Sequence, residues 1–429
     1  MIDHRTLRVA LLGAGSVGAQ VARLLLEHAD ELEERSGARL ELAGIAVRNI
    51  DAPRDVELPR ELFTTDAHEL IVGSDIVIEL MGGIEPARTY ILEALQSGAD
   101  VVTGNKALIA THGAEIFDAA DQVGASVSYE AAVAGAIPII RPLKDSLAGD
   151  IVTRIFGIVN GTTNYILDRM DKEGADFDAV LADAQALGYA EADPTADVEG
   201  HDAAQKAAIL ASLAFHTDVP LEKVHCEGIT KIDAAAIENA KKAGYVIKLL
   251  ATCERLPGGD DISVRVYPAL INRDHPLASV HGGNNAVYVE AEAAGPLMFY
   301  GAGAGGVQTA SAILGDVVSA ARRHIAGGGG VGESARGVHP IAEIGRITTR
   351  YQITLDVADE QGVLATVAGI LSDGGVSIAT FEQTATESGA RLVIGTHRAT
   401  EQALSDTVVA LGESGVVESV VTVLRVEGE

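Results

Sequence analysis

The sequence predicts an α/β protein with a doubly wound parallel sheet, followed by an α+β region and a small C-terminal domain. Short apolar runs alternate with helical patterns over residues 1–135, which is typical of a parallel sheet covered by helices. Beyond residue 136, helices mix with alternating strands. A glycine-rich stretch at 326–340 then separates a last segment with its own pattern.

The first region contains five predicted strands with helices between them. The helical patterns include 18–35 and 87–97. The strands are expected at 7–12, 40–47, 76–80, 101–103 and 126–129.

The middle region has a less regular rhythm. Helices are expected at 163–171, 175–187, 200–215 and 233–251, and strands at 262–266 and 286–291. The run GAGAGG at 301–306 precedes a helical pattern at 310–323, which we expect to pack back on the first region.

The C-terminal segment begins with an alternating strand pattern. Tyr351, Ile353, Leu355 and Val357 alternate with polar residues, as in a half-buried strand. A turn at 359–362 and further elements follow, so the predicted order is βαββαβ, as in ferredoxin-like domains. These further elements are a helix to about 372, strands near 376–383 and 390–397, a helix at 400–413 and a strand near 416–425.

The composition excludes several classes of protein. Lys plus Arg number 32 and Asp plus Glu 61, a net charge of −29, which argues against a nucleic-acid or anionic-membrane partner. The two cysteines have no pair spacing, so we expect neither a disulfide framework nor a zinc site. No apolar run is as long as the roughly 18 residues of a membrane helix, and the N-terminus has no signal-peptide pattern. We therefore expect a soluble, cytoplasmic protein.

A glycine-rich turn follows the first predicted strand. GAGSVG places Gly13, Gly15 and Gly18 between a strand and a helix, with Val17 inside the turn. This context is typical of a Rossmann-like dinucleotide site, although a purely structural turn is the alternative. The second strand ends at Arg48 without the acidic residue of an NAD-preferring site. Arg48 is therefore a candidate for a 2′-phosphate, which favours NADP(H) over NAD(H); a surface arginine is the alternative.

An acidic segment, AEADPTADVEGHDAAQK, occupies residues 190–206. Lys206 follows Asp202 by four residues on a predicted helix, so the two side chains share one face. The alternative is a solvated charged loop. The five carboxylates of the segment are Glu191, Asp193, Asp197, Glu199 and Asp202.

Three shorter motifs carry further candidates. Lys106, in TGNKALIA, follows a predicted strand at the crevice side of the sheet and could hold an anionic or carbonyl oxygen; a surface lysine at a helix start is the alternative. The backbone carbonyls of EAAVAGAIP (130–138) could bind a hard cation, although a hinge fits as well. NGTTNYIL (160–167) offers small polar side chains, with Thr162 or Thr163 as a helix cap.

Together these segments resemble homoserine dehydrogenase, the monofunctional bacterial type with a C-terminal ACT domain. The resemblance covers nearly the whole chain in order, and the block at 157–213 is its most specific part. Gly104 is a departure, because the family more often has Ala there. The matching pieces are GAGSVG, ELMGG, TGNKALIA, YEAAVAGAIP, GIVNGTTNYIL and LGYAEADPTADVEGHDAAQKAAILA.

The resemblance implies NAD(P)-linked interconversion of L-homoserine and L-aspartate 4-semialdehyde, on the route to threonine and methionine. It makes Lys206 the general acid/base, with Lys106 beside the nicotinamide and the substrate oxygen. The other implied sites are the substrate residues Glu191, Asp197 and Asp202; the cofactor residues Gly13, Gly15, Val17, Gly18, Arg48, Lys106 and Gly303; a sodium site at Glu130, Val133, Gly135 and Ile137; and an effector site for threonine at Asp359, Gln361, Gly362 and Val363.

The implied domain organisation has four segments, and a homodimer or homotetramer is expected. The segments are a dinucleotide-binding domain at 1–135, with 301–325 packing on it; a substrate-binding, catalytic and dimerisation domain at 136–300; a linker at 326–349; and an ACT-like regulatory domain at 350–429.

The chemistry agrees with these residues, and two alternatives stay open. A lysine is protonated at neutral pH and can supply the proton that aldehyde reduction requires. A non-catalytic sensor of nicotinamide cofactor and amino acid is the first alternative. Aspartate-semialdehyde dehydrogenase is the second, but it needs a thiol nucleophile, and neither Cys226 nor Cys253 has a suitable context.

Overall fold

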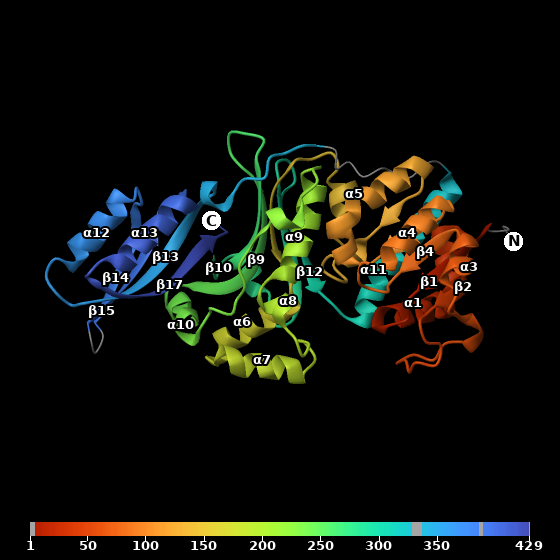
Figure 1. The fold of residues 1–429 in the computed structure, drawn as a ribbon, viewed down its shortest axis with the longest axis horizontal. Coiled ribbons are helices and arrows are strands. Elements are labelled where there is room, and N and C mark those ends of the chain that lie inside the picture. The colour runs from red at the N-terminus through yellow and green to blue at the C-terminus, as the bar shows by residue number, and fades with distance from the viewer. Residues whose placement is uncertain (1–4, 328–336, 386–388, 429) are drawn as a thin grey trace. The chain divides into compact units, whose positions relative to one another are not determined.

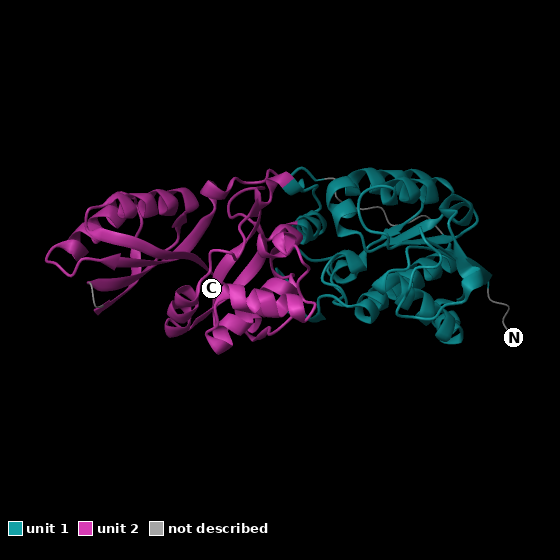
Figure 2. Cartoon of the chain, turned by 60° about the horizontal axis from the view of Figure 1, so that its bottom comes forward, with its two compact units in different colours: residues 1–152, 205–221, 285–338 teal, residues 153–204, 222–284, 339–429 magenta. Residues whose placement is uncertain are grey.

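The computed structural model describes residues 5–327, 337–385 and 389–428 (Figure 1). The chain forms two compact units, each built from three separate segments (Figure 2). The first takes Met1–Val152, Gln205–Leu221 and Asn285–Val338, and the second takes Thr153–Ala204, Glu222–Asn284 and His339–Glu429. The four predicted domain segments stay predictions, and most of the glycine-rich run at 326–340 lies outside the described residues.

The first unit contains the predicted parallel sheet. The strand order is β3-β2-β1-β4-β5-β6, and every neighbouring pair is parallel. All five predicted strands are confirmed, and the short β3 is an addition. The strands are β1 (Arg5–Leu12), β2 (Ala38–Ala46), β3 (Phe63–Thr64), β4 (Ile76–Glu79), β5 (Asp100–Thr103) and β6 (Val127–Ser128).

Helices cover this sheet, and one of them differs from the prediction. The predicted helix at 18–35 is two helices, α1 (Ser16–Glu27) and α2 (Ala29–Ser36), because His28 leaves the helical region at φ −109° and ψ 23°. Helix α11 (Gly306–Ala326) contributes Ile313, Val317 and other residues to the core beneath the sheet. The remaining helices are α3 (Ala67–Val72), α4 (Ala87–Gln96) and α5 (Lys106–Val123).

Two adjacent strands complete the picture of the first unit. Strand β11 (Asn284–Ala291) was predicted, whereas β12 (Gly295–Ala302) was not, and the two are neighbours in a sheet. β12 leads directly into the second glycine run and then into α11.

The second unit has a mixed sheet. In the order β7-β9-β10-β17-β13-β15-β14, β9 and β10 are antiparallel, whereas β10 and β17 are parallel. The C-terminal strand β17 therefore lies in the interior of the sheet, and β14 lies at its edge. These strands are β7 (Val152–Ile158), β9 (Tyr245–Arg255), β10 (Ile262–Asn272), β13 (Thr348–Val357), β14 (Ile378–Ala385), β15 (Ala390–Thr396) and β17 (Val417–Glu427).

The predicted helix at 233–251 is wrong in its second half. Helix α10 (Ala234–Lys242) ends before Gly244, which adopts φ +83°, and β9 starts at the next residue. Residues 246–254 are all buried, so β9 has no alternation to distinguish it from a helix by pattern. The helices between β7 and α10 are α6 (Gly161–Glu173), α7 (Phe177–Ala186), α8 (Thr195–Val198) and α9 (His201–Ala214).

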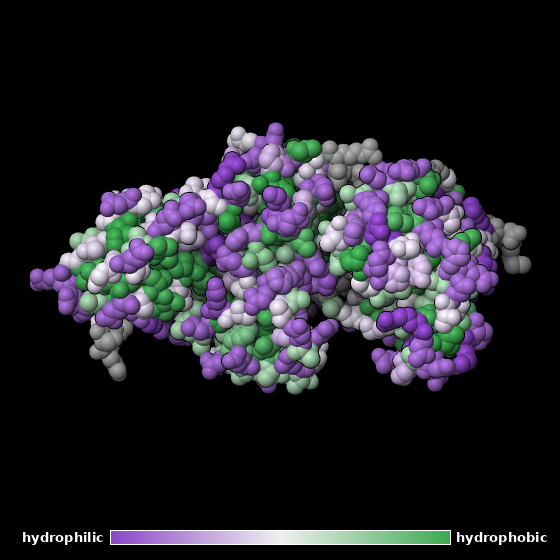
Figure 3. Space-filling view, viewed as in Figure 1, coloured by the Kyte–Doolittle hydropathy of each residue, from purple (hydrophilic) through white to green (hydrophobic). Residues whose placement is uncertain are grey.

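The C-terminal elements follow the predicted βαββαβ order, with the two-residue strand β16 (Ala399–Thr400) added between β15 and α13. Helices α12 (Val363–Asp373) and α13 (Glu401–Glu413) pack on β13 and β15 through an apolar core that includes Ile353, Leu355 and Leu392. In the view of Figure 3, apolar side chains gather over this part of the chain. Within the described residues, no helix has the length and apolar character needed to span a membrane.

Candidate functional site

The first glycine loop has the geometry of a turn that only glycine permits at two positions. Gly13 adopts φ +98°, and a Cβ there would lie 2.6 Å from the Leu80 carbonyl oxygen. A Cβ on Gly18 would collide with the carbonyl oxygen of Gly13, so α1 packs directly on the turn. Gly15 faces open space, which leaves its peptide groups accessible at the start of α1.

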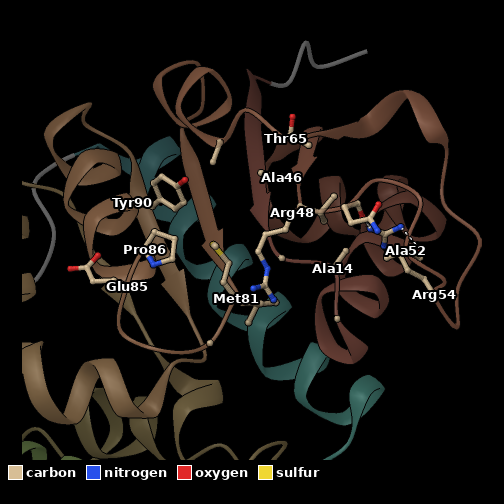
Figure 4. Close-up of a pocket in the computed structure, with 17 residues that line it drawn as sticks. Ala14, Ala46, Arg48, Ala52, Arg54, Thr65, Met81, Glu85, Pro86 and Tyr90 are labelled. Carbon is tan, nitrogen blue, oxygen red and sulfur yellow. Dashed lines mark hydrogen bonds between the residues drawn. The ribbon is translucent and has the colours of Figure 1, made fainter.

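A cavity of about 610 Å³ lies beside this loop. Its wall includes Gly13, Gly15, Arg48 and Met81, so the glycine loop, the end of β2 and the segment after β4 enclose it. Figure 4 shows the Arg48 side chain extending from the end of β2 toward Met81. The cavity lies at the carboxyl ends of β1 and β4, where the strand order reverses, which is the ligand-binding position of doubly wound sheets. Val17, also predicted here, is half-buried and packs on the core of the unit.

A second arginine, Arg54, shapes the same wall and was missed by sequence reasoning. Its guanidinium donates hydrogen bonds to the carbonyls of Asn49, Ile50 and Ala52 at 2.9–3.0 Å. It also lies 4.3 Å from the ring centroid of Phe63. Arg54 therefore fixes the loop after β2 around Arg48.

Lys106 opens helix α5 at the carboxyl end of β5. The Asn105 side chain caps this helix, accepting a hydrogen bond from the N–H of Leu108 at 3.2 Å. The fully buried Glu79, which sequence reasoning missed, accepts hydrogen bonds from Thr103 and from the N–H of Met81, both at 2.7 Å. Glu79 thus ties the end of β4 to the end of β5, and its signal in the sequence was the ELMGG block.

The departure at Gly104 has a small structural consequence. A Cβ there would lie 3.3 Å from the side chain of Leu80 and 3.5 Å from that of Ala131. A methyl group would therefore need only a slight adjustment, and glycine leaves the start of α5 unchanged.

The second glycine run meets the turn that was predicted to bind a cation. Ala134 and Gly135 both adopt φ +57°, and the N–H of Ala136 donates to the carbonyl of Ala302 at 3.2 Å. A Cβ on Gly135 would collide with the Gly303 carbonyl. Glu130, Val133, Gly135 and Ile137 therefore belong to one turn beside Gly303.

The carboxylate of Glu130 is used by the protein itself. It is buried and accepts hydrogen bonds from the N–H groups of Ile139 and Ile140 at 2.6 and 2.8 Å. It also accepts two from Arg141, at 2.8 and 3.0 Å. A cation at this turn would therefore take backbone carbonyl oxygens, which suit a hard ion. Over the described ranges, no group of three His, Cys, Asp or Glu side chains could hold a metal.

In the second unit, Asn160 organises the acidic segment. Its Nδ2 donates to Asp197 at 2.6 Å and to Asp202 at 2.9 Å, while its Oδ1 accepts from the N–H of Thr163. The helix cap expected at Thr162 or Thr163 is therefore Asn160, and Thr162 donates instead to the carbonyl of Tyr189. The segment was recognised in the sequence, but the residue that gathers it was not.

The five carboxylates do not act as one cluster. Asp197 and Asp202 meet at Asn160, and Asp202 is buried. Asp193 accepts a hydrogen bond from Thr195, and Glu199 accepts one from Thr230. Glu191 is exposed.

Lys206 lies on α9, one turn after Asp202. The side chain is only 9 % exposed, which is unusual for lysine and indicates a position held by the fold. Helix α9 fixes the spacing of the two residues.

The predicted effector residues lie at the start of α12. Gly362 caps this helix with φ +94°, and Val363 is buried as its first residue. Asp359 and Gln361 are exposed. The turn therefore presents two polar side chains beside a helix N-terminus.

Comparison with known proteins confirms the family. The model of the homoserine dehydrogenase NAD-binding domain matches residues 13–130, and the homoserine dehydrogenase model matches 138–318. The homoserine dehydrogenase of Corynebacterium glutamicum is 54% identical over 98% of this chain and 95% of its own. That of Mycobacterium tuberculosis is 53% identical over 99% of both chains.

Comparison with solved structures gives the same family. A homoserine dehydrogenase from Thiobacillus denitrificans superposes with a TM-score of 0.89 at 38% identity, covering 99% of both chains. A hyperthermophilic archaeal homoserine dehydrogenase in complex with NADPH covers 73% of this chain and 97% of its own, with a TM-score of 0.61 at 27% identity. The glycine loop and the acidic segment thus lie in a chain that belongs to the homoserine dehydrogenase family and is an NAD(P)-dependent oxidoreductase.

Proposed function

We propose that this homoserine dehydrogenase uses Lys206 as the proton donor to the substrate oxygen, with Asp197, Asp202 and Glu191 holding the amino-acid end of the substrate. The reaction interconverts L-homoserine and L-aspartate 4-semialdehyde. The observation that carries the proposal is the pair of hydrogen bonds from Asn160 to Asp197 and Asp202. Asp202 lies one helical turn before Lys206 on α9.

Each residue then has a physical task. The substrate ammonium is a cation, so the two carboxylates gathered by Asn160 suit it electrostatically. The Lys206 ammonium can donate a proton as negative charge develops on the carbonyl oxygen, and accept it back in the reverse direction. Lys106, the first residue of α5 after the carboxyl end of β5, would stabilise the same oxygen. The nicotinamide cofactor supplies or accepts the hydride.

Lys206→Met tests the proton donor. We expect turnover to fall by about two orders of magnitude or more, the usual range for a lost acid/base group, while NADPH still binds. Lys223→Met, at an exposed lysine on a short helical turn, is the matched control and should leave turnover unchanged. The readout is absorbance at 340 nm with the semialdehyde and NADPH. Near-normal turnover in folded Lys206→Met would remove the assignment.

The two alternative functions are not favoured. The family assignment disfavours a non-catalytic sensor. Burial raises the pKa of Cys226 to about 11 and that of Cys253 to about 12. Both thiols are therefore protonated at neutral pH and unsuited to the nucleophilic chemistry of aspartate-semialdehyde dehydrogenase.

We propose that NADP(H) is used at least as well as NAD(H). Arg48 lines the cavity, and the nearby acid Asp51 is paired with Arg60 at 2.7 Å. Arg48→Ala should lower kcat/KM for NADPH about tenfold or more, because a charge-assisted contact to the 2′-phosphate is lost. In the same variant, kcat/KM for NADH should not change. Arg39→Ala, at an exposed arginine on β2, is the control. A wild-type preference for NADH that Arg48→Ala leaves intact would contradict the proposal.

We propose a structural monovalent cation, Na⁺, on the carbonyl oxygens of Glu130, Val133, Gly135 and Ile137. The donor chemistry of the left-handed turn supports it. Na⁺ should raise the Tm saturably relative to choline at equal ionic strength, because a ligand that binds only the folded state stabilises it. Identical melting curves in the two salts would exclude the site.

We propose that residues 350–429 form an ACT-like domain that pairs between subunits of a dimer or tetramer and binds an amino acid, with threonine the leading candidate. The βαββαβ order, the open edge strand β14 and the polar turn at Asp359 and Gln361 support this. A module that only oligomerises is the alternative.

Point variants are the appropriate test, because truncation before β13 would remove β17 from beside β10. Asp359→Ala with Gln361→Ala should keep basal turnover and lose inhibition by millimolar threonine. Glu360→Ala, in the same turn, is the control. If threonine and related amino acids do not inhibit the wild-type enzyme, residues 350–429 form a module that only oligomerises.

A further inference from the structure

A buried asparagine beneath the second glycine run has no function in the scheme above. Asn285 lies on β11 and is 1 % exposed. Neither its Nδ2 nor its Oδ1 has a hydrogen-bond partner among the residues that the structure describes. Folded proteins rarely leave a buried amide without partners, because both its donor and its acceptor lose their hydration. The side chain therefore has unused hydrogen-bonding capacity in the interior of the first unit.

The amide lies directly against Gly303. A Cβ built on Gly303 would collide with the Nδ2 and Cγ atoms of Asn285, so a larger residue there would have to displace the Asn285 amide. The adjacency follows from the fold, because β11 and β12 are neighbouring strands and Gly303 comes directly after β12. Gly303 in turn contacts Gly135 in the left-handed turn. The Asn285 side chain thus packs directly against the second glycine run at Gly303.

A second contact connects this run to the cofactor cavity. A Cβ on Gly306 would lie 2.8 Å from the carbonyl oxygen of Ser16. Ser16 directly follows Gly15, which lines the cavity beside the first glycine loop. Gly305 adopts φ +132°, a conformation that other residues rarely take. The run from Gly301 to Gly306 therefore lies between the Asn285 amide on one side and the first glycine loop on the other.

We propose that Asn285 is a positioning residue for the nicotinamide cofactor. Its amide offers an acceptor and two donors, which match the N–H and C=O of a peptide group. Glycine peptides can reorient at little steric cost, so cofactor binding can bring peptide groups of residues 301–305 onto the Asn285 amide. The hydrogen bonds formed there stabilise the bound arrangement relative to the unbound one. The inference rests on the proposed role of Gly303 beside the cofactor.

Asn285→Leu is the decisive variant, because it keeps the approximate shape of the side chain and removes its polar atoms. Without cofactor, we expect a Tm equal to or above that of the wild type, since a buried unpartnered amide is replaced by an apolar group. With NADPH as the probe, we expect Kd to rise about tenfold, the size of one or two lost hydrogen bonds. Asn284→Leu is the matched control, because Asn284 is the preceding residue of β11 and its Nδ2 donates to the carbonyl of His281. It should bind NADPH like the wild type.

A paired substitution tests the contact itself. Gly303→Ala should weaken NADPH binding strongly, because the new methyl group collides with the Asn285 amide. Adding Asn285→Ala removes the obstruction, so Gly303→Ala should then cost little beyond Asn285→Ala alone. If Gly303→Ala lowers NADPH affinity equally in the wild type and in Asn285→Ala, the Asn285 amide is not the group that requires glycine at position 303.

The outcomes separate this inference from the function on which it rests. A lowered Tm in Asn285→Leu with a wild-type Kd for NADPH would make the amide purely structural, as with a buried bridging water, and would overturn the proposal. If the wild type bound neither NADPH nor NADH, the proposed cofactor site would fail instead. Should Asn285→Leu not fold, hydrogen exchange of the wild type decides. NADPH should slow exchange at residues 301–305, and unchanged exchange there during saturated binding would overturn the proposal.

Discussion

Arg425 joins the C-terminal elements to the rest of the second unit, and its removal should be costly. From β17, its guanidinium donates to both oxygens of Glu227 at 2.8 and 2.9 Å, and to both of Glu401 on α13 at 3.0 Å. It also lies 4.3 Å from the ring centroid of Tyr267 on β10. The side chain is 13 % exposed, and that of Glu401 is 5 % exposed.

Arg425→Met would leave two carboxylates without their shared cation. Glu401 would keep the hydrogen bond from the hydroxyl of Tyr351, which carries no charge. Removing one partner of a buried ion pair typically costs about 3–5 kcal/mol, because the remaining charge stays buried. At about 3 °C per kcal/mol for a unit of this size, the expected fall in Tm is about 10 °C.

The acid dependence of stability should change as well. Burial would raise the pKa of Glu227, but hydrogen bonds from His225 and Arg425 outweigh it and lower the pKa to about 2 from an ordinary 4.5. The stability that Glu227 contributes is therefore complete above about pH 4.5 and is lost as the pH falls toward 2. In Arg425→Met this acid-dependent loss should be smaller.

Urea unfolding of the full-length enzyme measures the effect, with Arg391→Met as the control. Arg391 also pairs through two hydrogen bonds, with Asp356 at 2.8 and 2.9 Å, but both side chains are about a third exposed. We expect that variant to lose less than about 1 kcal/mol. If Arg425→Met costs no more than Arg391→Met, solvent screens the Arg425 pairs and the reasoning from burial is refuted.

Three further outcomes are expected. Gly18→Ala should weaken NADPH binding at least tenfold in a fluorescence titration, because its methyl group collides with the Gly13 carbonyl; unchanged affinity would contradict this packing. Asp202→Asn should raise KM for homoserine more than KM for NADP⁺ in initial-rate assays, whereas equal effects would point to a folding defect. Burial lowers the pKa of Lys248 to about 8 from 10.5, so wild-type stability should rise as pH increases from 8 to 10.5, and Lys248→Met should flatten that rise in urea titrations.

Elements with a clear pattern of apolar residues could be predicted from the sequence. Elements whose limits depend on contacts with the rest of the fold could not. The strands of the parallel sheet and the βαββαβ order were recognised because each apolar run is bounded by turn residues. The break at His28 and the strand β9 were not. Residues 28–35 continue a helical pattern, and β9 is buried on both faces, so neither carries a local signal.

The candidate site shows the same division. Gly13, Gly18 and Lys106 belong to motifs whose chemistry is local in sequence, so they could be named without a structure. Asn160 and Asn285 could not, because their importance arises from partners 37 or 42 residues away in one case and 18 residues away in the other. The sequence around an asparagine does not show whether its side chain caps a helix, packs against a glycine or faces solvent.

The position of β17 has a consequence for the synthesis of this chain. Residues 417–427 are synthesised after every other strand of this sheet, yet they form an interior strand, with β10 on one side and β13 on the other. Until they emerge, Arg265 on β10 has no Glu427 to pair with, and the edge of β10 stays open at residues 269–271. The second unit can therefore complete its sheet only after residues 417–427 have emerged, whereas the strands of the parallel sheet, which end at residue 128, can pair much earlier in synthesis. Nascent chains stalled before residue 417 should be more sensitive to protease in the second unit than in the first.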